Sequence, residues 1–309
     1  MTRGIQSNLK WGWWLVAALV PVCALQAHAA NINALLPRLR AGQSMKYRVT
    51  ARLQRKTTTE SRVATMLKNP DLYRDLSGDI GLYVKQVRMD KGRPVVSATT
   101  RWIEPDPSPS VDAPKRVVEF RIGADGELAQ EQGLDDLDAE QRLAWQFWVA
   151  RFALGWALPP EGVKPGDKWK TREDEKAGSP IAGLYWEKET TYAHDDACPM
   201  IATETCAVFL TEATLKQRSS PKDATPDDYK VRELKTMGSV KGKNETITYI
   251  SRKTGLLMRA TEDAQQEMNV VIMKADGSNG VHYKLGATSH QEAVLEPPET
   301  ARDWPLTKH

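Results

Sequence analysis

The stretch KYRVTARLQ, residues 46–54, decides the fold class of this chain because it alternates apolar and polar side chains without a break. The two sets are Tyr47, Val49, Ala51 and Leu53 on one side and Lys46, Arg48, Thr50, Arg52 and Gln54 on the other. A period of two is that of a β-strand, whose successive side chains point to opposite faces. We therefore expect one buried and one wet face, which is typical of an antiparallel sheet.

Further strand-like runs follow toward the C-terminus. They cover residues 81–89, 93–104, 116–122, 184–194, 205–217, 230–240, 245–263, 267–275 and 281–295. Segments rich in turn residues are predicted as connections at 105–114, 219–228 and 276–280. Residues 57–79 lack a clear pattern, and the break at Asn69-Pro70-Asp71 favours a loop or a short helix there.

One long helix is predicted over residues 135–158. Residues 135–138 (DDLD) offer an N-cap and an acidic first turn, and Pro159-Pro160 ends the segment. From Leu143 to Trp156, apolar side chains occur nearly all round, interrupted by Gln146 and Arg151. A helix of this kind is usually buried between layers.

An internal duplication is one interpretation of the turns. RAGQSMKYRV (residues 40–49) and KPGDKWKTRE (residues 164–173) align without a gap, which places Gly42 on Gly166, 124 residues apart. A second pair of landmarks, Gly126 and Gly255, is 129 residues apart. Similar offsets favour two related halves of about 125 residues. The alternative is that glycine turns recur by chance in any β protein.

The fold class predicted from these patterns is mainly β. We expect an antiparallel curved sheet, or more than one, with two related halves as a hypothesis and one buried tryptophan-rich helix between them. The corresponding segments are 1–29 (signal peptide), 30–134 (N-terminal β half), 135–158 (apolar connecting helix), 159–295 (C-terminal β half) and 296–309 (tail).

The first 29 residues are typical of a secretory signal peptide. Arg3 and Lys10 form a basic region, residues 11–25 are apolar but short for a membrane span, and Ala27-His28-Ala29 offers a cleavage site after Ala29. We therefore expect a periplasmic or secreted protein with no transmembrane segment after cleavage. A retained anchor is the alternative, whereas lipidation of Cys23 is disfavoured by Val22.

Charge excludes one class of partner. Without residues 1–29, which hold two basic and no acidic residues, the chain has 41 basic and 40 acidic residues. A net charge of +1 without a basic block does not attract nucleic acid, so we expect no nucleic-acid partner.

Cysteine usage agrees with export. Cys198 and Cys206 are the two that remain after cleavage, and in an oxidising compartment they predict one disulfide between two strand-like runs. A metal pair assisted by His194 is the alternative, although further cysteine ligands are missing.

VKPGDKW, residues 163–169, resembles a turn-and-strand pattern of uncharacterised bacterial secreted, β-rich families, domains of unknown function. Lys253-Thr254-Gly255-Leu256-Leu257 matches the hairpin expected downstream in that pattern. The resemblance covers residues 155–260 and implies a strand opened by a turn; it implies no catalytic residue. A looser resemblance of architecture is to envelope carriers of the LolA and LolB type, in which helices cover the concave face of a curved sheet.

Motifs of catalysis are missing from the sequence. It contains no G-x-S-x-G, H-E-x-x-H or phosphate-binding glycine loop, so we expect a non-catalytic protein without cofactor or metal. A metal-dependent hydrolase using His194, His282 and His290 is the least favoured hypothesis.

Apolar aromatic residues are the remaining candidates for function. Together with a one-sided sheet they could cover a pocket for a lipid or another apolar ligand: Trp145, Trp148, Phe152, Trp156 and Trp186. The alternative is that the helix only fills the core. We thus expect binding of an apolar or lipid-like ligand or of an envelope component, with an interaction scaffold acting through strand edges and loops as the second hypothesis.

Overall fold

The computed structural model describes residues 35–61, 67–68, 71–105, 116–159, 162–175 and 179–297. The predicted signal peptide and its cleavage site lie outside these residues, as do most of the predicted loop 105–114 and the tail after residue 297. Among the described residues, no helix combines the length and the apolar character needed to cross a bilayer.

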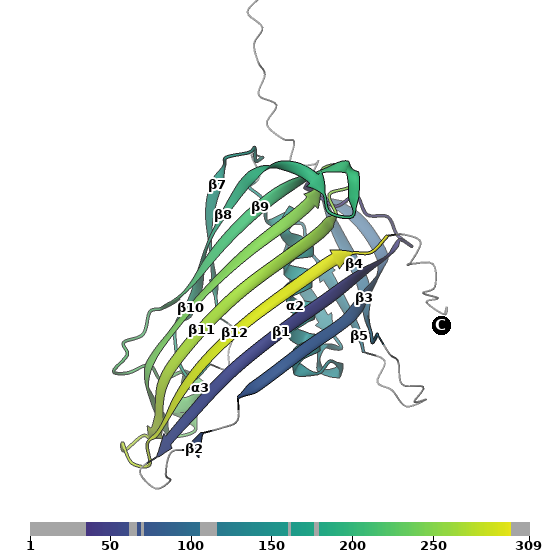
Figure 1. Ribbon diagram of the computed structural model, residues 1–309. Coiled ribbons are helices and arrows are strands. Elements are labelled where there is room, and N and C mark those ends of the chain that lie inside the picture. The colour runs from purple at the N-terminus through teal and green to yellow at the C-terminus, as the bar shows by residue number, and fades with distance from the viewer. Residues whose placement is uncertain are drawn as a thin grey trace, which may run out of the picture.

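One antiparallel sheet dominates the structure (Figure 1). Its strand order is β6-β5-β4-β3-β1-β12-β11-β10-β9-β8-β7, and the short β2 pairs with β1 outside this path. The strands are β1 (Ser44–Ser61), β2 (Leu67–Lys68), β3 (Leu72–Asp90), β4 (Arg93–Ile103), β5 (Val117–Ile122), β6 (Leu128–Gln132), β7 (Lys168–Asp174), β8 (Leu184–Cys198), β9 (Ile201–Gln217), β10 (Leu234–Ser251), β11 (Leu257–Lys274) and β12 (Val281–Leu295).

The alternation in residues 46–54 has the predicted effect. Tyr47 and Val49 are fully buried, whereas Arg48 and Arg52 are exposed. Side chains of paired residues on neighbouring strands point to the same face of a sheet. Tyr47 and its partner Ile80 on β3 accordingly both face inward. The predicted fold class, mainly β with a curved antiparallel sheet and a buried tryptophan-rich helix, is confirmed.

Residues 57–79, which lack a clear pattern in the sequence, are mostly strand where the structure describes them, and the Asn69-Pro70 part of the break lies outside the described residues. β1 continues to Ser61 and β3 begins at Leu72. The physical reason is long-range pairing: Thr57–Thr59 are β-branched and pair with Leu285–Tyr283 of β12, a partner that lies more than 220 residues away and leaves no local signature.

Helix α2 (Ala139–Phe152) lies against the inner, concave face of the sheet (Figure 1). Asp138 is its N-cap: the Asp138 side chain accepts a hydrogen bond from the Gln141 N–H at 2.8 Å, and the Gln141 side-chain oxygen accepts one from the Asp138 N–H at 3.2 Å. This is a capping box, which satisfies two free donors of the first turn. Three short helices are also present: η1 (Leu134–Asp136), η2 (Ala153–Ala157) and α3 (Asp227–Val231).

Aromatic rings join α2 to the N-terminal half of the sheet. Trp148 stacks on Phe152 with ring centroids 5.3 Å apart and lies 5.5 Å from Tyr47. The Trp145 indole N–H donates to the Thr100 hydroxyl at 2.8 Å, and the Trp156 N–H donates to the Pro94 carbonyl at 2.6 Å. Buried Trp residues normally need such a partner, so these bonds fix the helix against β4.

The glycines that motivated the duplication hypothesis share a backbone conformation. Gly42, Gly126, Gly166 and Gly255 all have positive φ, between 69° and 96°. Such turns favour glycine wherever they occur. A common ancestry and independent turns both explain this, so the duplication stays a prediction.

Candidate functional site

Small inward-facing side chains leave space beneath part of α2. At one end of the sheet the interior is filled by large residues such as Leu82, Trp102 and Phe120. Farther along the strands, the inward positions hold Ala51 on β1 and, on the neighbouring strands, Ala264 and Ala287. A cavity lies between α2 and this part of the sheet.

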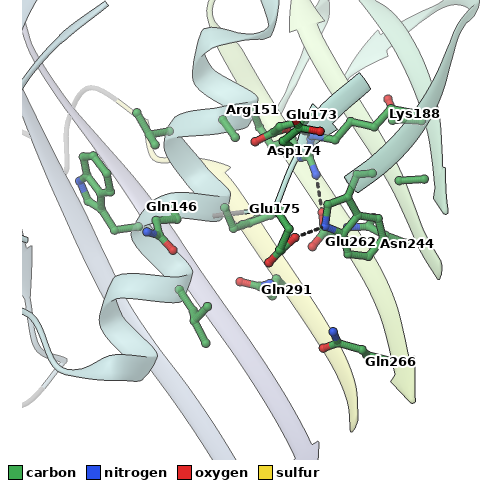
Figure 2. Close-up of a pocket in the computed structure, with 18 of the residues that line it drawn as sticks. Gln146, Arg151, Glu173, Asp174, Glu175, Lys188, Asn244, Glu262, Gln266 and Gln291 are labelled. Atoms are coloured by element: carbon green, nitrogen blue, oxygen red, sulfur yellow. Dashed lines mark hydrogen bonds and ion pairs between the residues drawn. The ribbon is translucent and has the colours of Figure 1, made fainter. Parts of the chain in front are cut away.

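This space, the α2 cavity, has a volume of about 710 Å³ and lies between α2 and the strands β7–β12 (Figure 2). A recess of about 260 Å³ adjoins it beneath α2, toward β1 and β3. Six residues line both spaces: Leu143, Trp186, Asn244, Glu262, Gln266 and Gln291. The two spaces therefore form one amphipathic trough, within the size range of small-molecule sites.

Helix α2 presents a different face to each of its two surroundings. The stripe toward the cavity has helical spacing and consists of Leu143, Gln146, Phe147, Ala150 and Arg151. The opposite stripe, which contains Trp148 and Phe152, is buried in the aromatic core. Leu143 is 53% exposed, which is unusual for a large apolar residue and places an uncovered apolar surface at the trough.

An ion pair connects α2 with the far wall of the cavity. The Arg151 guanidinium donates to the Glu262 carboxylate of β11 (Figure 2). Arg151 also donates to the Thr246 hydroxyl at 3.1 Å, and that hydroxyl lies 3.2 Å from the same carboxylate. The bridge is largely shielded from solvent, because 15% of the Arg151 side chain and 9% of the Glu262 side chain are exposed.

The mouth of the cavity, along β7 and β8, is polar and carries one aromatic wall. Lys188 forms an ion pair with Glu173, and the Trp186 indole N–H donates to the Glu175 carboxylate at 2.6 Å. The Trp186 ring lies over Gly242, where a Cβ atom would be only 3.1 Å from the ring. The missing side chain at that glycine lets the indole lie flat across the inner wall.

The five predicted ligand-binding residues occupy two environments. Trp145 and Trp186 line the α2 cavity, and Trp145 also belongs to the core cluster. Trp148, Phe152 and Trp156 are buried in the core cluster. Sequence reasoning did not propose Leu143, Gln146, Phe147 or Arg151 as site residues, although Gln146 and Arg151 were the two interruptions of the apolar helix. Those interruptions were the available signal.

The three histidines of the metal hypothesis are not brought together. His290 bonds to Asp263 at 2.8 Å, His282 contacts Glu60 at 3.4 Å and His194 lies 4.0 Å from Asp196. His282 and His290 are eight positions apart on β12, which corresponds to about 27 Å along a strand. Over the described ranges, no group of three His, Cys, Asp or Glu side chains could hold a metal ion.

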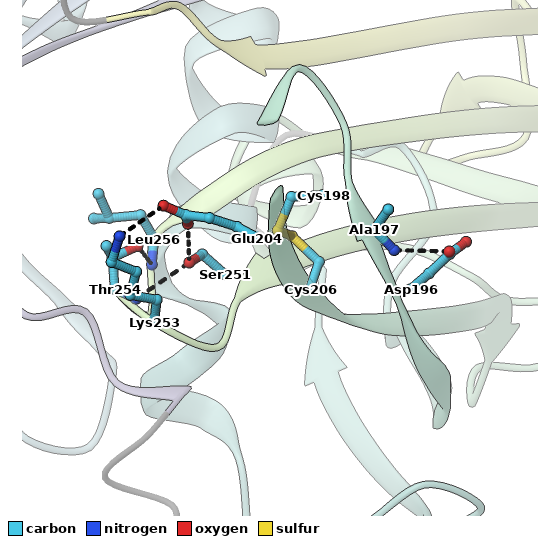
Figure 3. Close-up of a disulfide and its surroundings, with 9 residues drawn as sticks. All are labelled: Asp196, Ala197, Cys198, Glu204, Cys206, Ser251, Lys253, Thr254 and Leu256. Carbon is cyan, nitrogen blue, oxygen red and sulfur yellow. Dashed lines mark hydrogen bonds and ion pairs between the residues drawn. A yellow bond between two sulfur atoms is a disulfide. The ribbon is translucent and has the colours of Figure 1, made fainter. Parts of the chain in front are cut away.

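The predicted disulfide is confirmed between Cys198 and Cys206 (Figure 3). Their Cα atoms are 4.9 Å apart and the bond closes the β8–β9 hairpin. The disulfide packs on Met258 and Ile201. These two side chains also line a second pocket, of about 490 Å³, between the hairpin and the ends of β1 and β12.

The strand edges bear on the scaffold hypothesis. β7 is an edge strand of the sheet, and its exposed residues include Lys168, Lys170 and Arg172. Charged side chains, lysine above all, are a common device against edge-to-edge pairing. The β7 edge is therefore poorly suited to receive an added strand.

Comparisons with known proteins do not assign a family. No protein-family model matches the chain, and no curated protein matches it. Among solved structures, the outer membrane protein OprG from Pseudomonas aeruginosa aligns with 83% of this chain and 98% of its own at 7% identity and a TM-score of 0.17. Ail, the attachment invasion locus protein of Yersinia pestis, aligns with 83% of this chain and 100% of its own at 6% identity and a TM-score of 0.12. Scores this low support no argument about fold or function.

Proposed function

We propose that this protein is an exported, non-catalytic binding protein that holds a lipid-like amphiphile in the trough beneath α2. The observation that carries the proposal is the trough itself: about 710 Å³ of space plus an adjoining 260 Å³, with an apolar depth and a polar mouth. A core-filling helix alone does not explain why Leu143 stays 53% exposed over inward-facing alanines.

The distribution of side chains gives the ligand a direction. The lining of the recess includes Leu53, Leu76, Leu143 and the small Ala264 and Ala287, which suit an alkyl chain, together with the ion-paired Arg52, Arg74 and Glu140. Burying such a chain contributes roughly 0.8 kcal/mol per CH₂ group. The polar groups of the mouth, along β7 and β8, would receive the head group.

Export is the second part of the proposal. The disulfide supports it, since such bonds persist in oxidising compartments. The measurement is the intact mass of the protein purified from the cell envelope or medium. A mass that corresponds to cleavage after Ala29 agrees with the proposal, and a mass that includes residues 1–29 contradicts it.

Binding is tested with a neutral probe, decyl maltoside, kept below its micellar concentration. We expect saturable binding by calorimetry with a change in tryptophan fluorescence, because Trp186 lines both spaces. Native mass spectrometry of protein purified without detergent tests for a ligand that is retained from the cell.

A cavity-filling variant supplies the matched comparison. Ala287→Phe places a ring in the recess and should weaken decyl maltoside binding at least tenfold, by loss of space. Thr261→Phe, on the outward-facing parity of β11, should bind like the unmodified protein. Equal binding by all three proteins, or binding by none, would contradict the proposed function.

A further inference from the structure

The charges around the α2 cavity are unequal. Within the described part of the chain, the lining includes five carboxylates and two cationic side chains. The carboxylates are Glu131, Glu173, Asp174, Glu175 and Glu262, and the cations are Arg151 and Lys188. The lining therefore carries a formal excess of three negative charges, one of which, that of Asp174, is offset by an ion pair with Arg218 outside the lining.

Both cations are already engaged. Arg151 pairs with Glu262, and Lys188 pairs with Glu173. An anionic head group could use either cation only by displacing its carboxylate. For Glu262, whose side chain is 9% exposed, displacement would leave a nearly buried charge without its partner, which is strongly unfavourable.

A cationic head group meets no such obstacle. At the mouth, the Glu175 carboxylate accepts a hydrogen bond from the Trp186 indole at 2.6 Å, so an aromatic face and a carboxylate lie side by side. A cation over a tryptophan face is attracted by the ring quadrupole, and a carboxylate nearby adds to this attraction. Glu131 of β6 adds a further carboxylate to the lining.

We infer that the ligand of the α2 cavity is an amphiphile with an ammonium head group, an inference that rests on the proposed binding function. The head lies at the mouth, near Trp186 and Glu175, and the alkyl chain runs beneath Leu143 into the recess between α2 and β1. Carboxylate and phosphate amphiphiles of the same chain length are disfavoured by the negative lining.

The experiment compares three probes of equal chain length: decylammonium, decyl maltoside and decanoate, each below its micellar concentration. We expect decylammonium to bind about tenfold or more tightly than decanoate at low salt, with decyl maltoside between them. The preference should shrink as salt is added, because the mouth is open to solvent.

Two variants connect the preference to the mouth. Glu131→Gln/Glu175→Gln should reduce the preference for decylammonium over decanoate to within about threefold, since two of the carboxylates are neutralised. Glu245→Gln, an exposed glutamate on the outward parity of β10, is the matched control and should keep the full preference.

The outcomes separate the two proposals. Equal or tighter binding of decanoate would overturn the inference about the head group while leaving the binding function in place. An unchanged preference in the double variant would overturn it as well. Failure of all three probes to bind would overturn both proposals.

Discussion

Arg151 of α2 and Glu262 of β11 form an ion pair that links the helix to the C-terminal half of the sheet. On its other side, α2 is held by the aromatic cluster around Trp148 and Tyr47. The helix is thus fixed by apolar packing on one face and, toward β11, by this shielded charge pair. The space that remains between the two attachments is the α2 cavity.

Removal of one partner of this pair should destabilise the protein. Arg151→Met leaves the Glu262 carboxylate nearly buried without its cation, and we expect the free energy of unfolding to fall by about 3 kcal/mol. The double variant Arg151→Met/Glu262→Met should recover most of the loss, because two apolar side chains replace the two charges. Urea unfolding at neutral pH measures both effects.

An exposed pair provides the comparison. Lys230→Met breaks the Lys230–Asp227 pair of α3, whose side chains are 60% and 96% exposed, and should leave the free energy of unfolding almost unchanged. If Arg151→Met had as small an effect, the helix would be held by the aromatic core alone.

The disulfide should stabilise the β8–β9 hairpin. Replacement of Cys198 and Cys206 by serine is expected to cost about 2–3 kcal/mol by the chain-entropy estimate for so short a loop. Thermal unfolding with and without dithiothreitol measures this cost. The unmodified protein should lose stability with the reductant, whereas the serine variant should not respond. If dithiothreitol lowered the stability of both proteins equally, the Cys198–Cys206 disulfide would not be the cause of the effect.

The buried hydroxyl of Tyr47 is unusual. The residue is fully buried, and within the described ranges its hydroxyl has no hydrogen-bond partner. An unpaired buried polar group costs stability, so Tyr47→Phe should leave the protein equally stable or raise its free energy of unfolding by up to about 1–2 kcal/mol. Urea unfolding measures this change. Tyr192→Phe is the contrasting variant: the Tyr192 hydroxyl donates to Asp195 at 2.5 Å, so its removal should lower the free energy of unfolding.

Alkaline pH should unfold the protein in part through these two tyrosines. Burial raises the pKa of Tyr47 well above its usual value of 10.0. The pKa of Tyr192 is raised by burial and then by its hydrogen bond to Asp195, and the Arg252 charge offsets part of this effect. Below about pH 9 both hydroxyls are protonated in the folded and unfolded states, so they add no pH dependence.

Above pH 10 the unfolded chain loses these protons and the folded chain keeps them, so the free energy of unfolding falls as pH rises. Each group contributes about 1.4 kcal/mol per pH unit at most. Denaturant unfolding between pH 9 and 11.5 should show a shallower decline for Tyr47→Phe/Tyr192→Phe than for the unmodified protein. Parallel declines would exclude both residues as the cause.

Local patterns were sufficient to predict much of the fold. The alternation around Tyr47, the capping residues before α2 and the spacing of the two cysteines are each contained within a few residues, and each is confirmed. The lengths of β10 and β11, each 18 residues, were underestimated, because polar interruptions such as Gln265 and Gln266 are tolerated where a strand pairs on both sides.

The cavity could not be predicted in the same way. A helix that is apolar nearly all round has no periodicity to show which stripe faces the core, so its tryptophans were the natural candidates for a site. The pairing of Arg151 with Glu262, 111 residues apart, depends on strand register, which one sequence does not contain. Besides Trp145 and Trp186, which line the cavity, the polar interruptions at Gln146 and Arg151 pointed to the correct face.

Gly242 on β10 should control the shape of the cavity. A Cβ atom there would lie 3.1 Å from both the Trp186 ring and the Leu215 Cβ, which is closer than side chains normally approach. Gly242→Val should therefore push the Trp186 indole toward the cavity and reduce the space for a ligand. We expect altered tryptophan fluorescence, at least tenfold weaker binding of decylammonium and a stability loss of about 1–3 kcal/mol from overpacking.

Gly286→Val on β12 is the matched control, because a Cβ atom there meets nothing within 4 Å. It should bind decylammonium like the unmodified protein and keep its fluorescence. If Gly242→Val bound the probe with unchanged affinity while Trp186 fluorescence changed, the indole would move without contacting the ligand, and Trp186 would have to be removed from the site. If neither the affinity for decylammonium nor the fluorescence changed, the inner wall would accommodate the valine side chain. The shape of the cavity would then not depend on the glycine at position 242.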